Sequence, residues 1–181
     1  MNESLIVAAV EALLFISDSP VAVDRLSAVI GVDAAAVSKA LDTLGERYSR
    51  DDSGIEIQGV AGGFRLVTRP HVSEFVERFT RVKPAGLSQA ALETLAIVAY
   101  RQPVTRAEID MIRGVKSESA ISTLLERNLI KEAGRKPVLG RPMLYATTRE
   151  FLKHFGLGSI DDLPEVRPPS ETEYADESVG Q

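Results

Sequence analysis

The sequence predicts a mainly α protein with small β wings, an α+β fold, built as two tandem winged-helix domains. The first observation is a repeat, since residues 19–41, SPVAVDRLSAVIGVDAAAVSKAL, align without a gap on residues 102–124, QPVTRAEIDMIRGVKSESAISTL. Apolar positions, one proline and one glycine coincide, whereas polar positions differ, which indicates a duplicated structural unit. The second observation is that each copy shows helical periodicity followed by strand alternation, the order of a winged helix-turn-helix.

The first copy opens with two expected helices. Residues 5–16, LIVAAVEALLFI, form a compact apolar pattern of helical length. Pro20 stops helix propagation and favours an extended entry into the second helix, which we expect over residues 23–30. Gly31 follows, and glycine suits the left-handed conformation in which many helices end.

A third helix is expected over residues 34–50, with Asp33 as its N-cap. Its inward positions, at i, i+4, i+7 and i+11, are Val37, Leu41, Leu44 and Tyr48. The periodicity then changes, because residues 54–60, GIEIQGV, and residues 63–69, GFRLVTR, alternate apolar and polar residues around the pair Gly62-Gly63. This alternation predicts a β-hairpin, the first wing.

The second copy repeats this order. Its first helix is expected over residues 89–101, and Thr105 with Glu108 forms a capping box at the start of its second helix. Gly114 closes that helix, and Ser117 is expected to cap the third. The inward positions of the third helix and of the segment after it are Ile121, Leu124, Leu125 and Leu129.

The second wing includes residues 142–149, PMLYATTR, which echo GFRLVTR. We therefore expect an N-terminal winged-helix domain over residues 1–86, a C-terminal winged-helix domain over residues 87–163, and a disordered acidic tail over residues 164–181. The first domain ends in a short amphipathic linker helix, EFVERF. The three segments carry 9 basic and 12 acidic, 11 and 9, and 1 and 5 side chains, which gives net charges of −3, +2 and −4.

Composition limits the class of protein. The chain of 181 residues has no cysteine, which excludes disulfides and thiolate chemistry and fits a reducing cytosolic environment. No secretion signal pattern is present at the N-terminus. Residues 5–16 are too few to span a bilayer, and Glu11 interrupts them. We expect a cytoplasmic protein without a membrane partner.

Enzyme chemistry finds little support in the residues. The two histidines, His71 and His154, lie 83 residues apart and follow the two wings, so duplication accounts for them. No Cys or His cluster has metal-ligand spacing, and no glycine-rich phosphate loop leads from a strand into a helix. We expect no catalytic residue, no cofactor and no metal. A small enzyme stays an alternative that one well-formed pocket with convergent polar groups would revive.

Winged helices often bind DNA through their third helix, but the outward faces argue against it here. The outward positions are Ala34, Ala35, Ser38, Lys39, Asp42, Glu46 and Arg47 in one copy, and Glu118, Ser119, Ser122, Thr123, Glu126 and Arg127 in the other. Carboxylates stand where phosphates would lie, and the net charge of −5 repels DNA at long range.

The second wing carries one basic patch, formed by Arg135, Lys136 and Arg141. It is either a solvated hairpin tip or a weak contact with DNA or with an acidic protein. A DNA-binding winged-helix transcription regulator, with this wing as its contact, is therefore the alternative function.

Both first helices have more apolar surface than a helix of a small soluble domain needs. Residues 5–16 are apolar on nearly all sides, and residues 95–100, LAIVAY, show the same excess. Such a helix must be covered by its own core on one side and by something else on the other. Either the wing and the linker cover the second side, or at least one helix lies in a subunit interface.

Several motifs occur together in an order that resembles one family. They are EALLFISDSPV, LAIVAYRQPVTRAEID, IRGV, GRPMLYATT and FGLGSIDDLPE. Through them, residues 3–165 are similar to segregation and condensation protein B, the bacterial tandem winged-helix subunit of the condensin complex. The motif positions are Tyr100, Arg101, Gln102, Pro103, Gly114, Gly140, Arg141, Pro142 and Tyr145.

The resemblance implies a non-enzymatic interaction protein. The family forms a homodimer, mainly through the N-terminal winged helices. The dimer binds the kleisin subunit, segregation and condensation protein A (ScpA), which bridges the ATPase heads of the structural-maintenance-of-chromosomes (SMC) dimer. The assembly helps to compact and separate daughter chromosomes, so the resemblance implies a nucleoid-associated protein that meets DNA at most weakly and indirectly.

Two candidate partner surfaces follow from the apolar excess and from the resemblance. The expected dimer interface lies on the first helix, at Leu5, Ile6, Ala9 and Leu13. The expected kleisin contacts lie on the first helix of the second copy, at Ile97, Val98, Tyr100 and Arg101. An aromatic side chain and an arginine at the edge of an apolar patch are typical anchors. The alternative for Tyr100 is internal packing against the linker.

Overall fold

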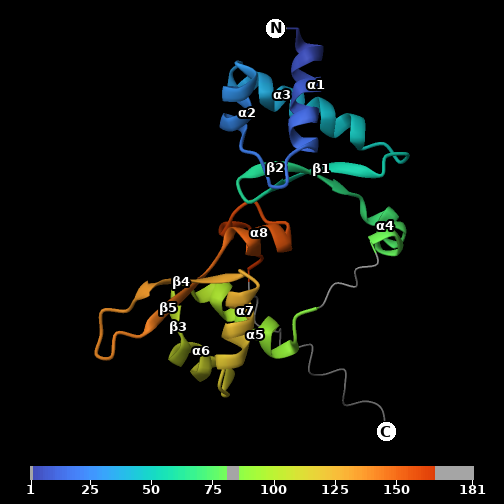
Figure 1. Cartoon of the computed structure of the whole chain (residues 1–181). Coiled ribbons are helices and arrows are strands. Elements are labelled where there is room, and N and C mark those ends of the chain that lie inside the picture. Colours follow the sequence, from blue (N-terminus) through green and yellow to red (C-terminus); the bar gives the residue numbers. More distant parts are fainter. Residues whose placement is uncertain (1, 81–85, 166–181) are drawn as a thin grey trace.

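The computed structural model describes residues 2–80 and 86–165 of the chain. Two groups of helices, each followed by a β-hairpin, lie at opposite ends of the molecule (Figure 1). This arrangement confirms the expected mainly α fold with small wings in two winged-helix units. The expected acidic tail lies outside the described residues from residue 166 onward, and the domain boundaries remain a prediction.

The N-terminal half contains every helix and strand expected from the sequence, with helix ends within two residues of the expected ones. Its elements are α1 (Glu3–Phe15), α2 (Val23–Ile30), α3 (Ala34–Tyr48), β1 (Ile55–Val60), β2 (Gly63–Thr68), the 3-10 turn η1 (Pro70–Val72) and α4 (Ser73–Thr80). The buried side chains of α1, α2, α3 and the segment between α1 and α2 form one core, made of Ile6, Val7, Val10, Leu14, Val21, Leu26, Val37, Ala40, Leu41 and Leu44.

Local signals end and begin these helices as predicted. Gly31 follows α2 in the left-handed conformation, with φ of 78°. The Asp33 side chain accepts a hydrogen bond of 2.7 Å from the Ala36 amide and caps α3. The expected inward positions of α3 face the core, where Val37, Leu41 and Leu44 are buried and Tyr48 is half-buried.

The first wing turns one residue earlier than its glycine pair suggested. β1 and β2 pair antiparallel, and Val60 opposite Gly63 is the last pair. Ala61 and Gly62 form the turn with φ of 51° and 70°, as a two-residue connection between twisted strands requires. Gly63 is needed for close packing, because a Cβ there would lie 2.8 Å from the carbonyl carbon of Val21.

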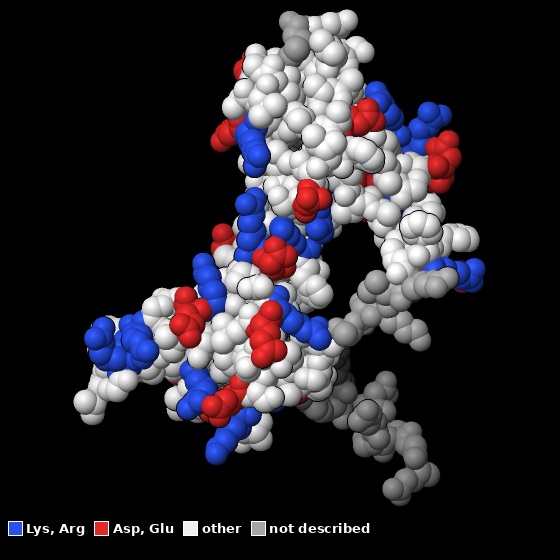
Figure 2. Space-filling model, viewed as in Figure 1, with Lys and Arg blue, Asp and Glu red and all other residues white. Residues whose placement is uncertain are grey.

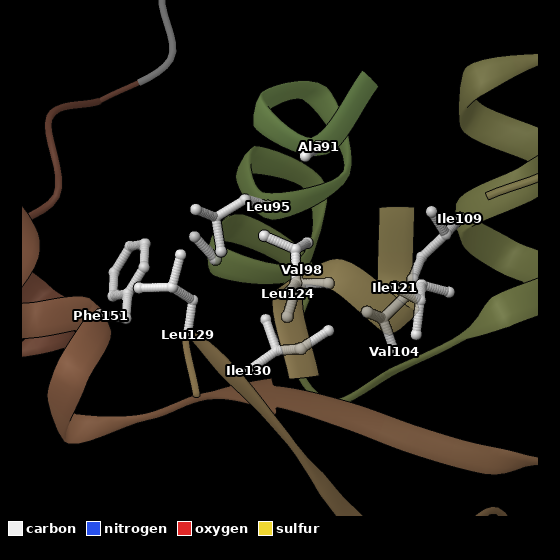
Figure 3. Packing of buried hydrophobic residues seen from close by; sticks show 11 residues of the cluster. Ala91, Leu95, Val98, Val104, Ile109, Ile121, Leu124, Leu129, Ile130 and Phe151 are labelled. Atoms are coloured by element: carbon white, nitrogen blue, oxygen red, sulfur yellow. The ribbon is translucent and has the colours of Figure 1, made fainter. Parts of the chain in front are cut away.

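The C-terminal half repeats the helical order and adds a short strand before its second helix. Its elements are α5 (Gln89–Arg101), β3 (Val104–Thr105), α6 (Arg106–Arg113), α7 (Glu118–Glu126), β4 (Ile130–Arg135), β5 (Met143–Thr147), α8 (Arg149–Phe155) and the 3-10 turn η2 (Ile160–Asp162). Its core side chains, among them Leu95, Val98, Leu124 and Ile130, point toward one another between α5, α7 and β4 (Figure 3). Phe151 brings α8 into the same core.

The C-terminal wing has a third strand that the sequence did not predict. β3 pairs with β5, so the sheet order is β3-β5-β4. The equivalent position in the first copy, Val21, forms only an isolated bridge with Phe64. Two residues are too few to show strand alternation, and their partners Tyr145 and Leu144 lie 41 and 39 residues further along the chain.

The capping box at the start of α6 is confirmed, whereas the expected cap of α7 is wrong. The amide and hydroxyl of Thr105 both donate to the Glu108 carboxylate, at 2.8 and 2.7 Å. The Ser117 side chain does not cap α7. Its amide donates to Asp110 (2.7 Å) and its hydroxyl accepts from Arg113 (3.2 Å), because the buried serine faces α6.

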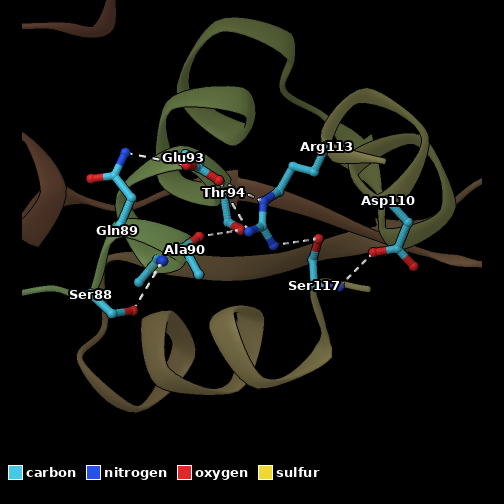
Figure 4. A network of polar contacts seen from close by, with 9 residues as sticks. Ser88, Gln89, Ala90, Glu93, Thr94, Asp110, Arg113 and Ser117 are labelled. Atoms are coloured by element: carbon cyan, nitrogen blue, oxygen red, sulfur yellow. Dashed lines mark hydrogen bonds and ion pairs between the residues drawn. The ribbon is translucent and has the colours of Figure 1, made fainter. Parts of the chain in front are cut away.

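Arg113 joins α5, α6 and the start of α7. Its guanidinium donates to Glu93 of α5 through Nε (3.3 Å) and Nη2 (3.1 Å), and to Ser117 through Nη1 (Figure 4). The Arg113 side chain is only 7% exposed, whereas Glu93 is half-exposed. A buried guanidinium with several acceptors is a stabilising contact whose loss leaves polar groups without partners.

The two halves meet where the first wing contacts the segment after α8 (Figure 1). The amide of Ala61 donates to the carbonyl of Leu157 (2.8 Å), and the amide of Gly62 donates to that of Gly158 (2.9 Å). Arg149 of α8 donates to the Ala61 carbonyl at 3.2 Å. The tip of the first wing is therefore hydrogen-bonded to the C-terminal half.

We expect Arg113→Met to lower the free energy of unfolding by about 2 kcal/mol, because it removes charge-assisted bonds to buried and half-buried acceptors. Arg106→Met is the matched control, since Arg106 pairs with Glu118 in solvent and exposed pairs contribute about 0.5 kcal/mol. Urea denaturation of the two variants measures the difference. Equal losses would show that Arg113 does not connect the three helices.

Candidate partner-binding surfaces

An open groove runs along the exposed face of α5 in the C-terminal half. Its volume is about 980 Å³, and it is bounded by α5, α6 and the segment around η2. The lining residues are Ala96, Ile97, Ala99, Tyr100, Arg101, Gln102, Ile112, Ile160, Asp161, Leu163, Pro164 and Glu165. We call this surface the α5 groove. Its mostly apolar lining, with polar groups on both α5 and the segment around η2, suits an apolar segment of a protein partner.

Three of the four expected kleisin-binding residues line the α5 groove. Ile97 is half-buried in its floor, while Tyr100 and Arg101 are exposed at its edge. Val98 is fully buried in the domain core and does not line the groove. Ile112 and the segment around η2 were not predicted to line this surface, because that segment has no periodicity and its contact with α5 is long-range.

Tyr100 is held by the chain that forms the opposite wall of the groove. Its hydroxyl donates to the carbonyl of Pro164 at 2.8 Å, while 43% of the residue remains exposed. Among the described residues this contact is with the C-terminal segment and not with the linker. The next residue but one, Gln102, accepts from the amide (2.7 Å) and hydroxyl (2.9 Å) of Thr147, which ties the end of α5 to β5.

The outward face of α1 is an apolar stripe. It consists of four exposed residues spaced as i, i+3, i+7 and i+10, Leu5, Ala8, Ala12 and Phe15. Of the expected interface residues, Leu5 belongs to this stripe, Ala9 and Leu13 are half-buried, and Ile6 is in the core. The spacing of the stripe was visible in the sequence, but the inward face has the same period and the same composition.

The first wing covers only one side of the α1 stripe. Tyr48, Ile55 and Leu66 line an open hollow of about 330 Å³ beside Ala12 and Phe15. Glu11, the charged residue in the middle of α1, lies in the same hollow and accepts from Tyr48 and from Arg47 (3.2 Å). Burial and the hydrogen bond to Glu11 raise the pKa of Tyr48 to about 12. The charge on α1 is therefore partnered within the protomer.

The helix α4 exposes two phenylalanines that the sequence analysis did not single out. Phe75 and Phe79 lie at i and i+4, and Phe79 is 89% exposed. The polar residues Glu74 and Arg78 form an ion pair on the same helix. A short helix with an uncovered aromatic pair is an apolar surface beyond what isolated exposed residues explain.

The basic groups of α3 are paired with carboxylates, and α7 carries carboxylates but no basic group. Lys39 of α3 pairs with Glu3 (3.0 Å) and Arg47 pairs with Glu11 (3.2 Å). On α7, Glu118 pairs with Arg106 at 3.5 Å. Blue and red atoms are mixed over both halves in Figure 2. These faces therefore offer little free positive charge to a phosphate backbone.

The expected basic patch of the second wing is only partly free. Lys136 pairs with Glu108 of the capping box at 2.6 Å. This bond, with the two bonds from Thr105, lowers the pKa of Glu108 from 4.5 to about 2. Arg135 and Arg141 are exposed at the base of the hairpin tip, and no carboxylate among the described residues pairs with either.

The described residues contain no group of three or more His, Asp or Glu side chains placed to hold a metal. In the same part of the chain, no helix is long and apolar enough to cross a membrane. What the described surface does offer is apolar faces on α1, α4 and α5. The chain is thus a tandem winged-helix protein whose open surfaces suit protein partners better than a phosphate backbone.

Comparison with known proteins agrees with this class. The family described as Segregation and condensation complex subunit ScpB matches residues 8–166. Segregation and condensation protein B of Desulforamulus reducens is 49% identical over 156 residues, which cover 86% of each chain. The chain therefore belongs to the segregation and condensation protein B family.

Two solved structures are also similar. ScpB from Mycobacterium tuberculosis is 36% identical and covers 87% of this chain and 98% of its own, with a TM-score of 0.43. A dimer of an ScpB N-terminal domain complexed with an ScpA peptide is 25% identical and covers 42% of this chain and 95% of its own, with a TM-score of 0.41.

Because the bonds from Lys136 and Thr105 lower the pKa of Glu108, we expect this carboxylate to make a pH-dependent contribution to the free energy of unfolding. A carboxylate whose pKa is lowered on folding stabilises the protein above its unfolded pKa of 4.5, and this contribution is lost as the pH falls toward 2. We expect Lys136→Met to raise the pKa of Glu108 toward 4.5 without reaching it, because the Thr105 bonds remain. A carboxyl ¹³C NMR titration measures this.

Thr105→Val is the comparison variant, since it removes the hydroxyl and keeps the amide and Lys136. Glu108→Gln should flatten the dependence of the unfolding free energy on pH between about 4.5 and 2. An unchanged Glu108 titration in Lys136→Met would show that the ion pair does not persist in solution.

Proposed function

We propose that this chain is a non-enzymatic subunit of the bacterial SMC–kleisin condensin complex and supports chromosome condensation and segregation. The observation that carries the proposal is family membership over residues 8–166, joined to the open apolar faces on the equivalent helices α1 and α5. The N-terminal half forms a homodimer, and the C-terminal half binds ScpA. ScpA connects the chain to the SMC ATPase, and the complex acts in the cytoplasm on the nucleoid.

The α1 stripe supports the proposed homodimer. Burying an apolar face removes it from water at about 25 cal/mol per Å², and small side chains in its middle let two helices approach closely. Ala8 and Ala12 occupy the middle of the stripe, with Leu5 and Phe15 at its ends. Burying the α1 stripe in a dimer does not leave the Glu11 carboxylate without hydrogen bonds, because Arg47 and Tyr48 of the same protomer donate to it.

The α5 groove supports the proposed ScpA contact. Its floor is apolar at Ile97, Ile112 and Leu163, while Arg101 and Tyr100 stand at the edge. The Tyr100 hydroxyl is already bonded to Pro164, so the ring is fixed before a partner arrives. Preorganised aromatic side chains cost little conformational entropy on binding and are typical interface anchors.

The alternative of a transcription regulator has weaker support. On α3, Lys39 and Arg47 are paired with Glu3 and Glu11, so this helix offers little free charge to DNA. In the second wing, the expected contact of a regulator, Lys136 is paired with Glu108, which leaves two arginines. The proposal as a whole is tested by light scattering of the chain alone and then with purified ScpA. We expect a dimer that binds ScpA. A monomer without ScpA affinity would refute the proposal.

We expect Ala12→Glu to weaken the homodimer at least tenfold, because the new carboxylate would be buried in the α1 interface without a partner. Ala35→Glu is the matched control, since Ala35 is an exposed alanine in the first turn of α3. Sedimentation velocity over a concentration series measures both. A wild-type dimer that Ala12→Glu leaves intact would show that dimerisation uses another face.

We expect Tyr100→Ala to weaken ScpA binding about 30-fold, the equivalent of roughly 2 kcal/mol for an anchor residue. Tyr100→Phe keeps the ring and separates its contribution from the bond to Pro164. Val115→Ala is the control, an exposed apolar residue that does not line the groove. Isothermal titration calorimetry with purified ScpA gives the affinities.

Melting temperatures of the same variants separate binding from folding. If Tyr100→Ala melts the domain and leaves the affinity per folded molecule unchanged, Tyr100 belongs to the fold and not to the interface.

A further inference from the structure

The tip of the second wing projects from the molecule and carries exposed aliphatic side chains (Figure 1). Residues 136–142, KPVLGRP, connect β4 to β5 and carry Val138 and Leu139 at their end. Leu139 is 104% exposed and Val138 about half. Leu139 therefore does not stabilise the fold by packing within the protomer, and an exposed aliphatic side chain of this kind often marks a contact with a partner.

The tip is folded by its own backbone and is not a loose loop. The Lys136 amide donates to the Pro142 carbonyl, the Val138 amide to the Lys136 carbonyl, and the Arg141 amide to the Val138 carbonyl, each at 2.9 Å. Gly140 and Arg141 both have positive φ, 82° and 39°. The left-handed pair turns the chain sharply and leaves the apolar side chains at the apex.

Free positive charge lies directly behind the apolar apex. Arg135 donates to the Arg141 carbonyl at 3.1 Å, so the two arginines adjoin at the base of the tip. Figure 2 shows a group of blue atoms at the free end of this hairpin, with white atoms beyond it. Lys136 adds little, because its ammonium is paired with Glu108.

The shape of the wing tip and the positive charge behind it indicate which kind of partner fits. A convex ribbon tip needs a concave partner, and an apolar point backed by cations needs a partner with anions on its rim and an apolar interior. The minor groove of duplex DNA is about 6 Å wide and edged by phosphates. The apolar interior is the base stack beneath it, because minor-groove proteins insert apolar side chains between base steps.

We infer that the second wing is a minor-groove wedge, in which Leu139 inserts at a base step of duplex DNA while Arg135 and Arg141 contact the flanking phosphates. Two phosphate contacts give a salt slope of about −1.8, so the isolated chain binds weakly and only at low salt. The residues that make this contact are separate from those proposed for ScpA binding and for dimerisation. At physiological salt, DNA occupies the wing only when a partner complex holds the chain near DNA, because tethering raises the local DNA concentration.

The test is an NMR titration of the full ¹⁵N-labelled chain with a 12-base-pair AT-rich duplex at about 20 mM salt, where few contacts suffice for detection. We expect shift changes confined to residues 135–142. Leu139→Ser should weaken binding about fivefold and leave the melting temperature unchanged, because Leu139 packs against nothing in the protomer. Met111→Ser, an exposed apolar change on α6, is the control.

Arg141→Gln should reduce the salt slope by about 0.9, whereas Lys116→Gln, an exposed cation outside the wing, should not. A duplex with 2-aminopurine at the central step should brighten on binding the wild-type chain and not on binding Leu139→Ser. The inference is overturned by shifts on α3 or α7, by unchanged affinity of Leu139→Ser, or by no binding at all. An equal response to polyglutamate would overturn it in favour of an acidic protein partner.

Discussion

The packing of α1 against α3, and of α5 against α7, is the contact on which the rest of the structure depends. Val10 and Leu44 meet in one core, Val98 and Leu124 in the other, and all four are fully buried. Each of these contacts uses one face of a first helix, although α1 and residues 95–100 of α5 are apolar on more than one side. The winged-helix fold is thus complete while an apolar face stays open on each copy. The same feature that builds the two cores leaves the two surfaces that we assign to partners.

Electrostatics follows from where the carboxylates lie. The cations of α3 are paired with Glu3 and Glu11, Arg106 of α6 is paired with Glu118 of α7, and Lys136 of the wing is paired with Glu108. These pairs are mostly in solvent and add little to stability. Their larger effect is on recognition, because a paired cation is a poor contact for a phosphate. The protein therefore has the winged-helix fold, but the third helix, which contacts DNA in many winged-helix proteins, has few unpaired positive charges.

The duplicated units differ most in their wings. The first wing has a two-residue turn whose amides donate to the carbonyls of Leu157 and Gly158. The tip of this wing is therefore part of the contact between the two halves. The second wing has a seven-residue connection, residues 136–142, that projects from the molecule with an apolar apex. Gly63 shows how specific the first arrangement is, because any side chain there would collide with the backbone of Val21. The first hairpin therefore holds the two halves of the protein together, whereas the tip of the second hairpin is exposed and can contact a partner.

The sequence by itself determined the helices, the caps of α3 and α6 and the duplication, because these depend on residues close together in the chain. Asp33 caps α3 and Gly31 ends α2 through bonds and φ values that neighbouring residues decide. Only the tertiary structure decided that Val98 is core while Tyr100 faces a groove, that Ser117 turns toward α6, and which face of α1 is inside. A helix with apolar residues on both sides has no period that separates inward from outward. The position of the groove wall after α8 and the short strand β3 are likewise invisible to periodicity. The wall is placed by packing on the C-terminal core and by the bond from Tyr100 to Pro164, and β3 is formed by pairing with β5.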